Sequence, residues 1–543
     1  MAKMIFPQYR RGKTGIEIFE GSILDHARKL GIEISSECGG DGRCGKCVVR
    51  IESGKESLAP KTKAEKSFQL GEDERLACQA WGESPIPLKK KVIKPADIYV
   101  FVREMGEYTI LADTVEDKML LDPFVYKRDG KVFWKGSAGE EELSEYTGGI
   151  YGLAIDVGTT TLVSQVLDLE SGDRIATLTR KNPQGAYGDD VISRAGYTMS
   201  HEGGLEELQQ VIVNAVNDSL KGLALDMEEI YEAVIVGNST MRSIFFGVDV
   251  SSLGVLPFEP FTKESLNVKA SELGLQINPR ANVYGAGLIG GHAGADALGD
   301  ILASEMYKSE KPAMTIDVGT NGEVMVGNKD QILTASCAAG GAYEGATVRS
   351  GVGAIEGAIK NIKIVNGRAE YETIGDKPAI GICGSGLIDL LAEMLRNGII
   401  DREGKLTTPE REFFVDRDKG ISIAQEDVNQ LMLARSGMSL DQKSLIRYYK
   451  TNLEEIDRIY LAGAFGNYVN ADNAIAIGLL PDAKEKVVKI GNGALAGARQ
   501  MLVSQEKRRE AENIVKKIKH LKPNEEDGFF DAFVDGLCFE SWR

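Results

Sequence analysis

The fold of this chain is decided by two stretches, residues 151–161 (YGLAIDVGTTT) and residues 313–323 (AMTIDVGTNGE). Each begins with an apolar run that predicts a buried strand, and each passes into Asp-Val-Gly-Thr. After the first stretch we expect a second strand at 162–168, a turn at 170–173 and a third strand from Arg174. The second stretch has the same sequel at 324–336. The sequence therefore predicts an internal duplication of a strand–loop–strand–turn–strand unit.

The two Asp-Val-Gly-Thr loops carry the chemistry of phosphate binding. A glycine lets the backbone approach a phosphate and aim N–H groups at it, and threonine hydroxyls add donors. An aspartate at a strand end can place Mg²⁺, which prefers few carboxylates together with phosphate oxygens. One such loop could be an ordinary β-turn, but the duplicated context predicts a nucleotide site. The predicted catalytic residues are Asp156 and Asp317, and the predicted nucleotide contacts in these loops are Gly158, Thr159, Thr160, Thr161, Gly319, Thr320, Asn321, Gly322 and Glu323.

Four cysteines near the start of the chain have the spacing of an iron–sulfur site. The order is C-x5-C-x2-C with a fourth cysteine thirty residues further on, formed by Cys38, Cys44, Cys47 and Cys78. Plant-type [2Fe–2S] ferredoxins use C-x4-C-x2-C and a distant fourth cysteine, so this loop has one extra residue. The alternative is a four-cysteine zinc site, which usually takes two C-x2-C pairs, whereas only one pair exists here. The spacing therefore predicts a [2Fe–2S] cluster.

The segments around the cysteines predict a small β-grasp domain. We expect a hairpin from 3–9 and 15–19, a helix at 22–30 and a strand at 48–51. Prolines 85, 87 and 95 indicate that this domain ends near residue 90. The predicted domains are 1–90 (ferredoxin-like), 91–149 (linker and small middle region, with strands at 98–102 and 131–134) and 150–543 (ATPase, with lobes at about 150–300 and 301–543).

Length and composition limit the class of protein. A chain of 543 residues exceeds what one hydrophobic core usually organises, so several domains are expected. The formal net charge of −17 argues against nucleic acid as a partner, because phosphate backbones are bound by clustered lysine and arginine. The sequence has no apolar run long enough for a signal peptide or a membrane span. Seven cysteines are too few for a disulfide scaffold, and we expect a cytoplasmic protein with metal-ligating thiolates.

The pair of loops resembles the two phosphate motifs of the acetate and sugar kinase, Hsp70 and actin superfamily. Residues 234–240, with Asn238, resemble its first connecting motif, and residues 458–467 resemble its adenosine motif, with Gly463, Ala464, Phe465 and Gly466. Gly384, Ser385 and Gly386 open a predicted helix that either meets nucleotide at its N-terminus or is a packing helix with a glycine start. The expected fold class is α/β and α+β multidomain, with a β-grasp domain followed by a duplicated, actin-like (RNase H-like) ATPase.

The order of ferredoxin domain, linker and ATPase resembles the reductive activators of corrinoid-dependent methyltransferase systems. That resemblance implies ATP-dependent transfer of an electron from the [2Fe–2S] cluster to an inactive Co(II) corrinoid protein, which restores Co(I). It also implies ATP and Mg²⁺ as cofactors, a corrinoid protein and a low-potential electron donor as partners, and a homodimer.

Two other functions remain open at this point. A small-molecule kinase with a redox-sensing iron–sulfur domain would release a phosphorylated product. An activator of a 2-hydroxyacyl-CoA dehydratase shares the ATPase fold, but that family typically holds its cluster between subunits with far fewer cysteines. The separate ferredoxin-like domain therefore counts against the second alternative.

Overall fold

The computed structural model describes most of the chain, in two units that are treated separately below. The described residues are 3–6, 15–19, 21–30, 32, 34, 42, 47–66, 68, 70–81, 98–102, 121–136, 139–338, 341–345, 347–407, 409, 411–463 and 468–539. The N-terminal unit comprises Met1–Gly106 and Pro183–His201, and the large unit comprises Glu107–Asn182 and Glu202–Arg543.

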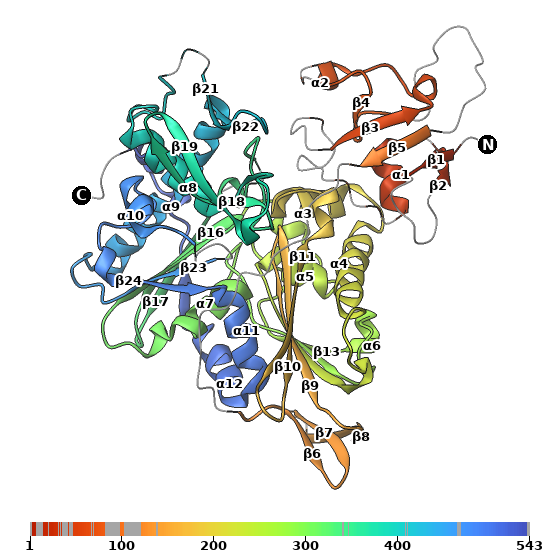
Figure 1. Ribbon diagram of the computed structural model, residues 1–543. Helices are drawn as coiled ribbons and strands as arrows, with labels where there is room; N and C mark the ends of the chain where they lie inside the picture. Colours follow the sequence, from red (N-terminus) through yellow and green to blue (C-terminus); the bar gives the residue numbers. More distant parts are fainter. Residues whose placement is uncertain are drawn as a thin grey trace. The chain divides into compact units, whose positions relative to one another are not determined.

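The N-terminal unit contains a five-stranded sheet in the order β2-β1-β5-β3-β4 (Figure 1). Its elements are β1 (Lys3–Ile5), β2 (Gly15–Glu17), α1 (Ile23–Lys29), β3 (Val48–Ser53), η1 (Lys55–Ser57), α2 (Lys63–Lys66), β4 (Glu74–Leu76), β5 (Ile98–Val102), η2 (Pro183–Ala186) and α3 (Val191–Ser200). Helix α1 starts where expected, because Ser22 and Asp25 form a capping box. The predicted hairpin, helix and strand are all confirmed.

Strand β5 lies beyond residue 90, where the prolines predict the end of this domain. It nevertheless pairs in parallel with β1 and antiparallel with β3, and so forms the middle of the same sheet. The reason is topological: β1 and β3 do not pair with each other, and a later segment has to complete the ladder between them. The predicted strand at 98–102 exists, but it belongs to this sheet and not to the middle region.

The large unit contains two six-stranded sheets. The first has the order β11-β10-β9-β12-β14-β13 and the second β24-β23-β15-β16-β17-β25. The strands of the first are β9 (Tyr151–Val157), β10 (Thr161–Asp168), β11 (Arg174–Lys181), β12 (Ile230–Val236), β13 (Leu266–Lys269) and β14 (Asn282–Gly285). Those of the second are β15 (Ala313–Val318), β16 (Asn321–Gly327), β17 (Ile332–Ala338), β23 (Ile459–Ala462), β24 (Val487–Gly491) and β25 (Ile518–His520).

Helices and smaller sheets surround these two sheets. The helices are α4 (Gly204–Leu220), α5 (Ser239–Phe245), α6 (Ala270–Leu273), α7 (Ala295–Ser304), α8 (Gly384–Arg396), α9 (Gln425–Tyr449), α10 (Ala471–Ala476), α11 (Gly493–Val503), α12 (Gln505–Ile514) and α13 (Phe529–Asp535). The small sheets contain β6 (Val125–Arg128), β7 (Lys131–Gly136) and β8 (Gly139–Glu145), then β18 (Ala358–Val365), β19 (Arg368–Thr373) and β20 (Gly381–Ile382), then β21 (Glu412–Asp416) and β22 (Ile421–Ala424). In the part of the chain that the structure describes, no helix is both long enough and apolar enough to span a membrane.

The two large sheets repeat one topology. In each, the first strand is central, pairs antiparallel with the second strand along the chain, and pairs in parallel with the fourth. The apolar runs therefore become buried central strands, β9 and β15, as the sequence predicts. The duplication is confirmed, and in each repeat it extends beyond the three strands that the sequence indicates. A further parallel strand, β14 or β24, pairs with the fourth strand, β12 or β23.

Helices α7 and α11 lie side by side between the repeats (Figure 1). They approach so closely that a Cβ on Gly497 would lie 2.4 Å from the Gly299 Cα. Helix α7 carries the chain from the first repeat into β15. Residues 234–240, which resemble a connecting motif, instead form the end of β12 and the start of α5, inside the first repeat.

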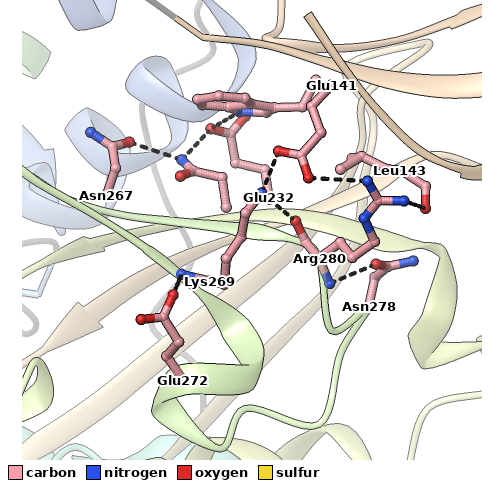
Figure 2. A network of polar contacts seen from close by, with 10 residues as sticks. Glu141, Leu143, Glu232, Asn267, Lys269, Glu272, Asn278 and Arg280 are labelled. Carbon is pink, nitrogen blue, oxygen red and sulfur yellow. Dashed lines mark hydrogen bonds and ion pairs between the residues drawn. The ribbon is translucent and has the colours of Figure 1, made fainter. Parts of the chain in front are cut away.

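The three-stranded sheet β6–β8 is held on the first repeat by a polar network (Figure 2). The Glu141 carboxylate accepts hydrogen bonds from Lys269 Nζ at 2.6 Å and from Arg280 Nη2 at 3.2 Å. Nearby, the buried Glu232 Oε1 accepts from Arg508 Nη1 at 2.8 Å and from Trp134 Nε1 at 3.4 Å. The segment from 121 to 149 is therefore anchored to the large unit.

Candidate nucleotide and cluster sites

The two phosphate loops meet at one edge of the large sheets. Each loop follows the carboxyl end of a central strand, where open α/β sheets bind their ligands. The hydroxyls of Thr160 and Thr320 lie 3.0 Å apart, although they are separated by 160 residues. The loops that the sequence pairs by similarity are therefore neighbours in space.

Thr159 and Gly158 in the first loop are fixed by two asparagines. Asn238 caps α5 by accepting from Met241 N at 3.0 Å, and its Nδ2 donates to Thr159 Oγ1 at 2.9 Å. Asn182, which the sequence analysis missed, donates from Nδ2 to Gly158 O at 2.8 Å. Gly158 has to be a glycine, because a Cβ there would lie 2.5 Å from a backbone oxygen. Asn238 thus supports the loop through Thr159.

Asp156 is a half-buried residue near the end of β9, and among the described residues its carboxyl has one side-chain donor. Asn492 Nδ2 donates to Asp156 Oδ2 at 2.9 Å, and Asn492 also caps α11 by accepting from Leu495 N at 2.8 Å. Burial raises the pKa of Asp156 to about 7, and the charges of Asp296 and Glu344 add to this increase. The hydrogen bond from Asn492 has the opposite effect and lowers the pKa. Asn492 is a site residue that the sequence analysis did not find.

Asp317, at the equivalent position of the second repeat, lies among other acids. Burial raises the pKa of Asp317 to about 7, and the charges of Asp156 and Glu344 add to the effect. Burial and the Asp317 charge likewise raise the pKa of Asp296 to about 7 and that of Asp300 well above its usual range. Asp300 is fully buried, and neither carboxyl oxygen has an N–H or hydroxyl donor among the described residues. Its neighbour is the Asp317 carboxyl.

Asp296 and Asp300 were missed from the sequence, although a signal for them exists. They are four residues apart at the start of α7, and an i, i+4 pair projects from one face of a helix. Glu323, which the sequence does predict, belongs to the same acidic group. Burial and the charge of Asp296 raise the pKa of Glu323 well above its usual range. The hydrogen bond that Ser336 Oγ donates to Glu323 at 3.2 Å acts in the opposite direction.

A glycine follows the fourth strand of each repeat and packs on the phosphate loop. Gly463 has φ 111°, and a Cβ there would lie 2.6 Å from Val318 O and 2.9 Å from Asp317 Oδ1. Gly237 has φ 152°, and a Cβ there would lie 2.7 Å from Val157 O. Both positions therefore require glycine. Of the expected adenosine residues only Gly463 is described, because Ala464, Phe465 and Gly466 lie outside the described residues.

The remaining predicted contacts differ in their surroundings. Thr161 and Asn321 are the first residues of β10 and β16, Gly322 follows Asn321, and Gly319 lies in the second loop. At the start of α8, Ser385 Oγ donates to Lys360 O at 2.7 Å, and a Cβ on Gly386 would lie 2.4 Å from Ile359 O. Gly384, like these two, is buried. These contacts favour the packing interpretation of the α8 N-terminus.

In the N-terminal unit two of the four predicted cluster ligands lie together. The Sγ atoms of Cys47 and Cys78 are 3.3 Å apart and both residues are buried, whereas a disulfide bond measures about 2.05 Å. Cys38 and Cys44 lie outside the described residues. The strand that leads to Cys78 is held by a buried ion pair between Arg75 Nε and Glu65 Oε1 at 2.7 Å. Two converging thiols fit part of a metal–sulfur site.

These two units define a class: an ATPase of the actin-like fold joined to a ferredoxin-like domain. The chain matches three family models: "2Fe-2S iron-sulfur cluster binding domain" over residues 12–81, "RACo middle region" over 151–309, and "C-terminal domain of RACo the ASKHA domain" over 311–542. The predicted fold class is confirmed, and so are a [2Fe–2S] cluster and ATP as cofactors of these domains.

Relatives of known activity narrow the class to one family. The chain is 30% identical to the corrinoid activation enzyme RamQ of Eubacterium limosum over 96% of both chains. It is 26% identical to the [Co(II) methylated amine-specific corrinoid protein] reductase of Methanosarcina barkeri, over 68% of this chain and 73% of that protein. A solved structure, the reductive activator for corrinoid, iron-sulfur protein, superposes with a TM-score of 0.74 at 28% identity, covering 100% of this chain and 99% of the other. The chain belongs to the RACo family of corrinoid activation enzymes.

Proposed function

We propose that this enzyme is an ATP-dependent reductive activator, which transfers an electron from its [2Fe–2S] cluster to a Co(II) corrinoid protein and restores Co(I) for methyl transfer. The observation that carries the proposal is the presence of two sites in one chain. One unit brings two thiols to 3.3 Å, and the other brings two phosphate loops to 3.0 Å. The names of the relatives supply the corrinoid partner.

Coupling to ATP answers an energetic problem. Plant-type [2Fe–2S] centres have potentials near about −400 mV. If the cobalt couple lies lower by roughly 100 mV, moving one electron costs about 2.3 kcal/mol. A ligand that binds one of two states about 10⁴-fold more tightly supplies about 5.5 kcal/mol. Nucleotide binding that changes how the enzyme holds its partner is therefore sufficient, and hydrolysis resets the cycle.

The carboxyls of Asp156 and Asp317 fit a bound Mg²⁺–nucleotide. Carboxyls that burial holds near neutral pKa are stabilised as carboxylates when a cation approaches them. Among the described residues no three His, Cys, Asp or Glu side chains form a ready metal-ligating group. Mg²⁺ takes one or two carboxylates and completes its shell with phosphate oxygens and water. Asp156 and Asp317 would place the metal ion, and Thr160 and Thr320 would bind phosphate oxygens.

Asp296 would orient the water that attacks the terminal phosphate. It lies at the start of α7 in the same acidic group, and its pKa of about 7 suits proton transfer near neutral pH. Its position depends on α7, because Asp296 Oδ1 accepts from Ala297 N at 2.8 Å and from Gly294 N at 3.2 Å.

The remaining parts of the proposal concern organisation. A low-potential protein or small molecule would reload the cluster, the working form would be a homodimer, and the location would be the cytoplasm, where thiolate ligands stay reduced. We place the functional domains at 1–90, 91–149 and 150–543, with β5 as an addition to the first and the β6–β8 sheet as an anchored spacer.

The coupling is tested by following Co(II)-to-Co(I) conversion optically with a purified corrinoid protein. We expect conversion with ATP, much slower conversion without ATP, and no ATP effect in Asp317→Ala. The matched control is Asp330→Ala, which removes an exposed aspartate from the turn between β16 and β17 and should retain the ATP effect. Equal rates with ATP, without ATP and in Asp317→Ala would refute the coupling.

The cluster is tested separately by substitution of its ligands. Cys47→Ser and Cys78→Ser should each lose the visible absorption and the reduced-state paramagnetic signal of a [2Fe–2S] centre after anaerobic reconstitution. Cys538→Ser is the control, since Cys538 lies in the large unit and should leave both signals intact. A wild-type protein that reconstitutes only with zinc would contradict the assignment.

A further inference from the structure

Glu344 lies against both phosphate loops at once. Its Oε2 accepts a hydrogen bond from Thr160 Oγ1 at 3.0 Å and another from Thr320 Oγ1. The two hydroxyls are themselves 3.0 Å apart, so the carboxylate oxygen and both hydroxyls form one compact group. A single side chain therefore joins the two repeats at the point where their loops meet.

The turn that carries Glu344 is firmly held. Glu344 ends the short 3-10 turn η6 (Ala342–Glu344), which is flanked by Gly341 at φ 65° and Gly345 at φ 79°. Tyr343 is fully buried and donates from its hydroxyl to Leu431 O at 3.2 Å, and Gly341 N donates to Thr320 O at 3.3 Å. A Cβ on Gly345 would lie 2.5 Å from Val352 N. The backbone thus presents the carboxylate to the threonines from a fixed position.

The number of hydrogens that the two threonines can donate prevents them from binding Glu344 and a phosphate at the same time. A threonine hydroxyl has one hydrogen to donate, and a carboxylate oxygen can only accept, so the two contacts with Glu344 Oε2 require the hydrogen of each threonine. A phosphate oxygen accepts hydrogen bonds and has no hydrogen to give in return, as does a carboxylate. Thr160 and Thr320 therefore cannot donate to Glu344 and to a phosphate at the same time.

We propose that Glu344 is an internal competitor of the nucleotide phosphates, which holds the two loops together through Thr160 and Thr320 and has to release them before phosphate binds. The inference rests on the proposed function and adds a control element to the same site. A carboxylate imitates the acceptor oxygens and negative charge of a phosphate, so it can satisfy both hydroxyls without a nucleotide. Its charge also acts on the aspartate of each repeat, Asp156 and Asp317.

The test is the affinity of the full-length protein for a non-hydrolysable ATP analogue with Mg²⁺, measured by titration calorimetry. Glu344→Ala should bind the analogue about tenfold more tightly than wild type, equivalent to ~1.4 kcal/mol. Glu344→Gln, which keeps an acceptor but loses the charge, should fall between the two. In ATP hydrolysis the same variants should lower KM more than they change kcat, because the competitor acts on binding.

Two controls separate competition from general effects. Glu356→Gln removes an exposed negative charge from the same unit and should leave the affinity unchanged. In a protein that also carries Thr320→Val, the increase in affinity caused by Glu344→Ala should be smaller, since one of the two hydroxyls for which Glu344 and phosphate compete is gone. A gain of the same size in that background would overturn competition through the hydroxyls.

The outcomes distinguish this inference from the proposed function. If wild type binds the analogue and Glu344→Ala binds it equally or more weakly, Glu344 is not a competitor. The inference is then overturned, whereas the proposed function stands. If wild type binds no adenine nucleotide, both the inference and the proposed function are overturned. Cluster absorption and the melting temperature of Glu344→Gln show that the comparison is between folded proteins.

Discussion

The two repeats of the large unit share a topology and differ in their electrostatics. In the first repeat, Asp156 receives a hydrogen bond from an amide, that of Asn492. In the second repeat, the equivalent Asp317 has the Asp300 carboxyl as its neighbour, and the charge of Asp317 also acts on Glu323. One strand order therefore supports an aspartate with an amide donor on one side and an aspartate beside a second carboxyl on the other.

This difference indicates a division of labour. Duplication fixes where the loops meet, because the carboxyl ends of parallel strands lie at one edge of each sheet. Side chains on α7 and at the start of α11 then give the two loops different surroundings. We infer that the first loop, with Thr159, Thr160 and Thr161, mainly binds phosphate, and that the second mainly places the cation.

The largest effect expected from this division is a difference between Asp317→Asn and Asp156→Asn. Asp317→Asn should lower kcat for ATP hydrolysis by about 100-fold, because the loss of a positioning charge at a reacting phosphate costs about that much. Asp156→Asn should lower it by about tenfold, since Asp156 already has an amide partner that an asparagine can meet through its oxygen. The measurement is steady-state hydrolysis with and without the corrinoid partner. Equal losses of kcat in the two variants would contradict the division of labour.

Gly463 and Gly237 give the next comparison, in stability. Alanine at either position has a positive φ and a Cβ within 2.7 Å of a backbone oxygen, so we expect each substitution to lower the free energy of unfolding by about 2–3 kcal/mol. Only Gly463→Ala also presses on Asp317 Oδ1, at 2.9 Å. It should therefore weaken nucleotide binding more than Gly237→Ala does.

Gly398→Ala is the matched control for these glycines. Gly398 has φ 64°, but a Cβ there would meet nothing within 4 Å. The substitution isolates the backbone strain, which is about 1 kcal/mol. If Gly398→Ala destabilises as much as Gly463→Ala in chemical denaturation, the close approach to the loop contributes nothing.

The duplicated strands and the loop residues could be predicted because their signals are local. An apolar run that ends in Asp-Val-Gly-Thr is contained in eleven residues, and its repetition at 313–323 needs no knowledge of packing. The cluster spacing is equally local around Cys44 and Cys47, and it correctly pairs Cys47 with the distant Cys78.

The missed site residues depend on contacts between distant segments. Asp300 reaches Asp317 only because α7 packs beside β15, and Asn492 reaches Asp156 across 336 residues. The prolines before β5 predict a linker, whereas the place of β5 is set by the gap between β1 and β3. These features follow from tertiary pairing, which single-segment patterns do not contain.

The acidic group around the two loops predicts an unusual dependence of stability on pH. Asp156, Asp296 and Asp317 have folded pKa values of about 7 against a usual 3.8. When the pH rises from about 4 to about 7, the unfolded chain loses protons that the folded chain retains, so the free energy of unfolding falls. The penalty is absent below the usual pKa and complete above about pH 7. Without Mg²⁺ or nucleotide, the melting temperature should therefore be higher near pH 5.5 than near pH 8.

Asp300→Asn sharpens this prediction. Among the described residues neither oxygen of this buried carboxyl has an N–H or hydroxyl donor. Its removal should raise the free energy of unfolding by about 1–2 kcal/mol near pH 8 and by less near pH 5, which is closer to the usual pKa of an aspartate. Asp330→Asn, at an exposed turn, should change neither value. The prediction fails if Asp300→Asn destabilises the protein at both pH values.

The smallest expected effect compares two helix-capping asparagines that hold the first loop. Aspartate is as good an N-cap as asparagine, so Asn492→Asp and Asn238→Asp should both retain their helices. Asn238→Asp leaves an acceptor opposite Thr159, whose hydroxyl can reverse and donate, so the free energy of unfolding should change by less than about 0.5 kcal/mol. Asn492→Asp instead places a carboxylate against Asp156, which raises the pKa of Asp156 further and should cost about 1 kcal/mol near pH 8.

Denaturation at two pH values measures both variants, and the cost of Asn492→Asp should disappear near pH 5, where the two carboxyls can share a proton. A cost that persists at low pH would show that Asn492 acts through the geometry of α11 and not through the charge of Asp156.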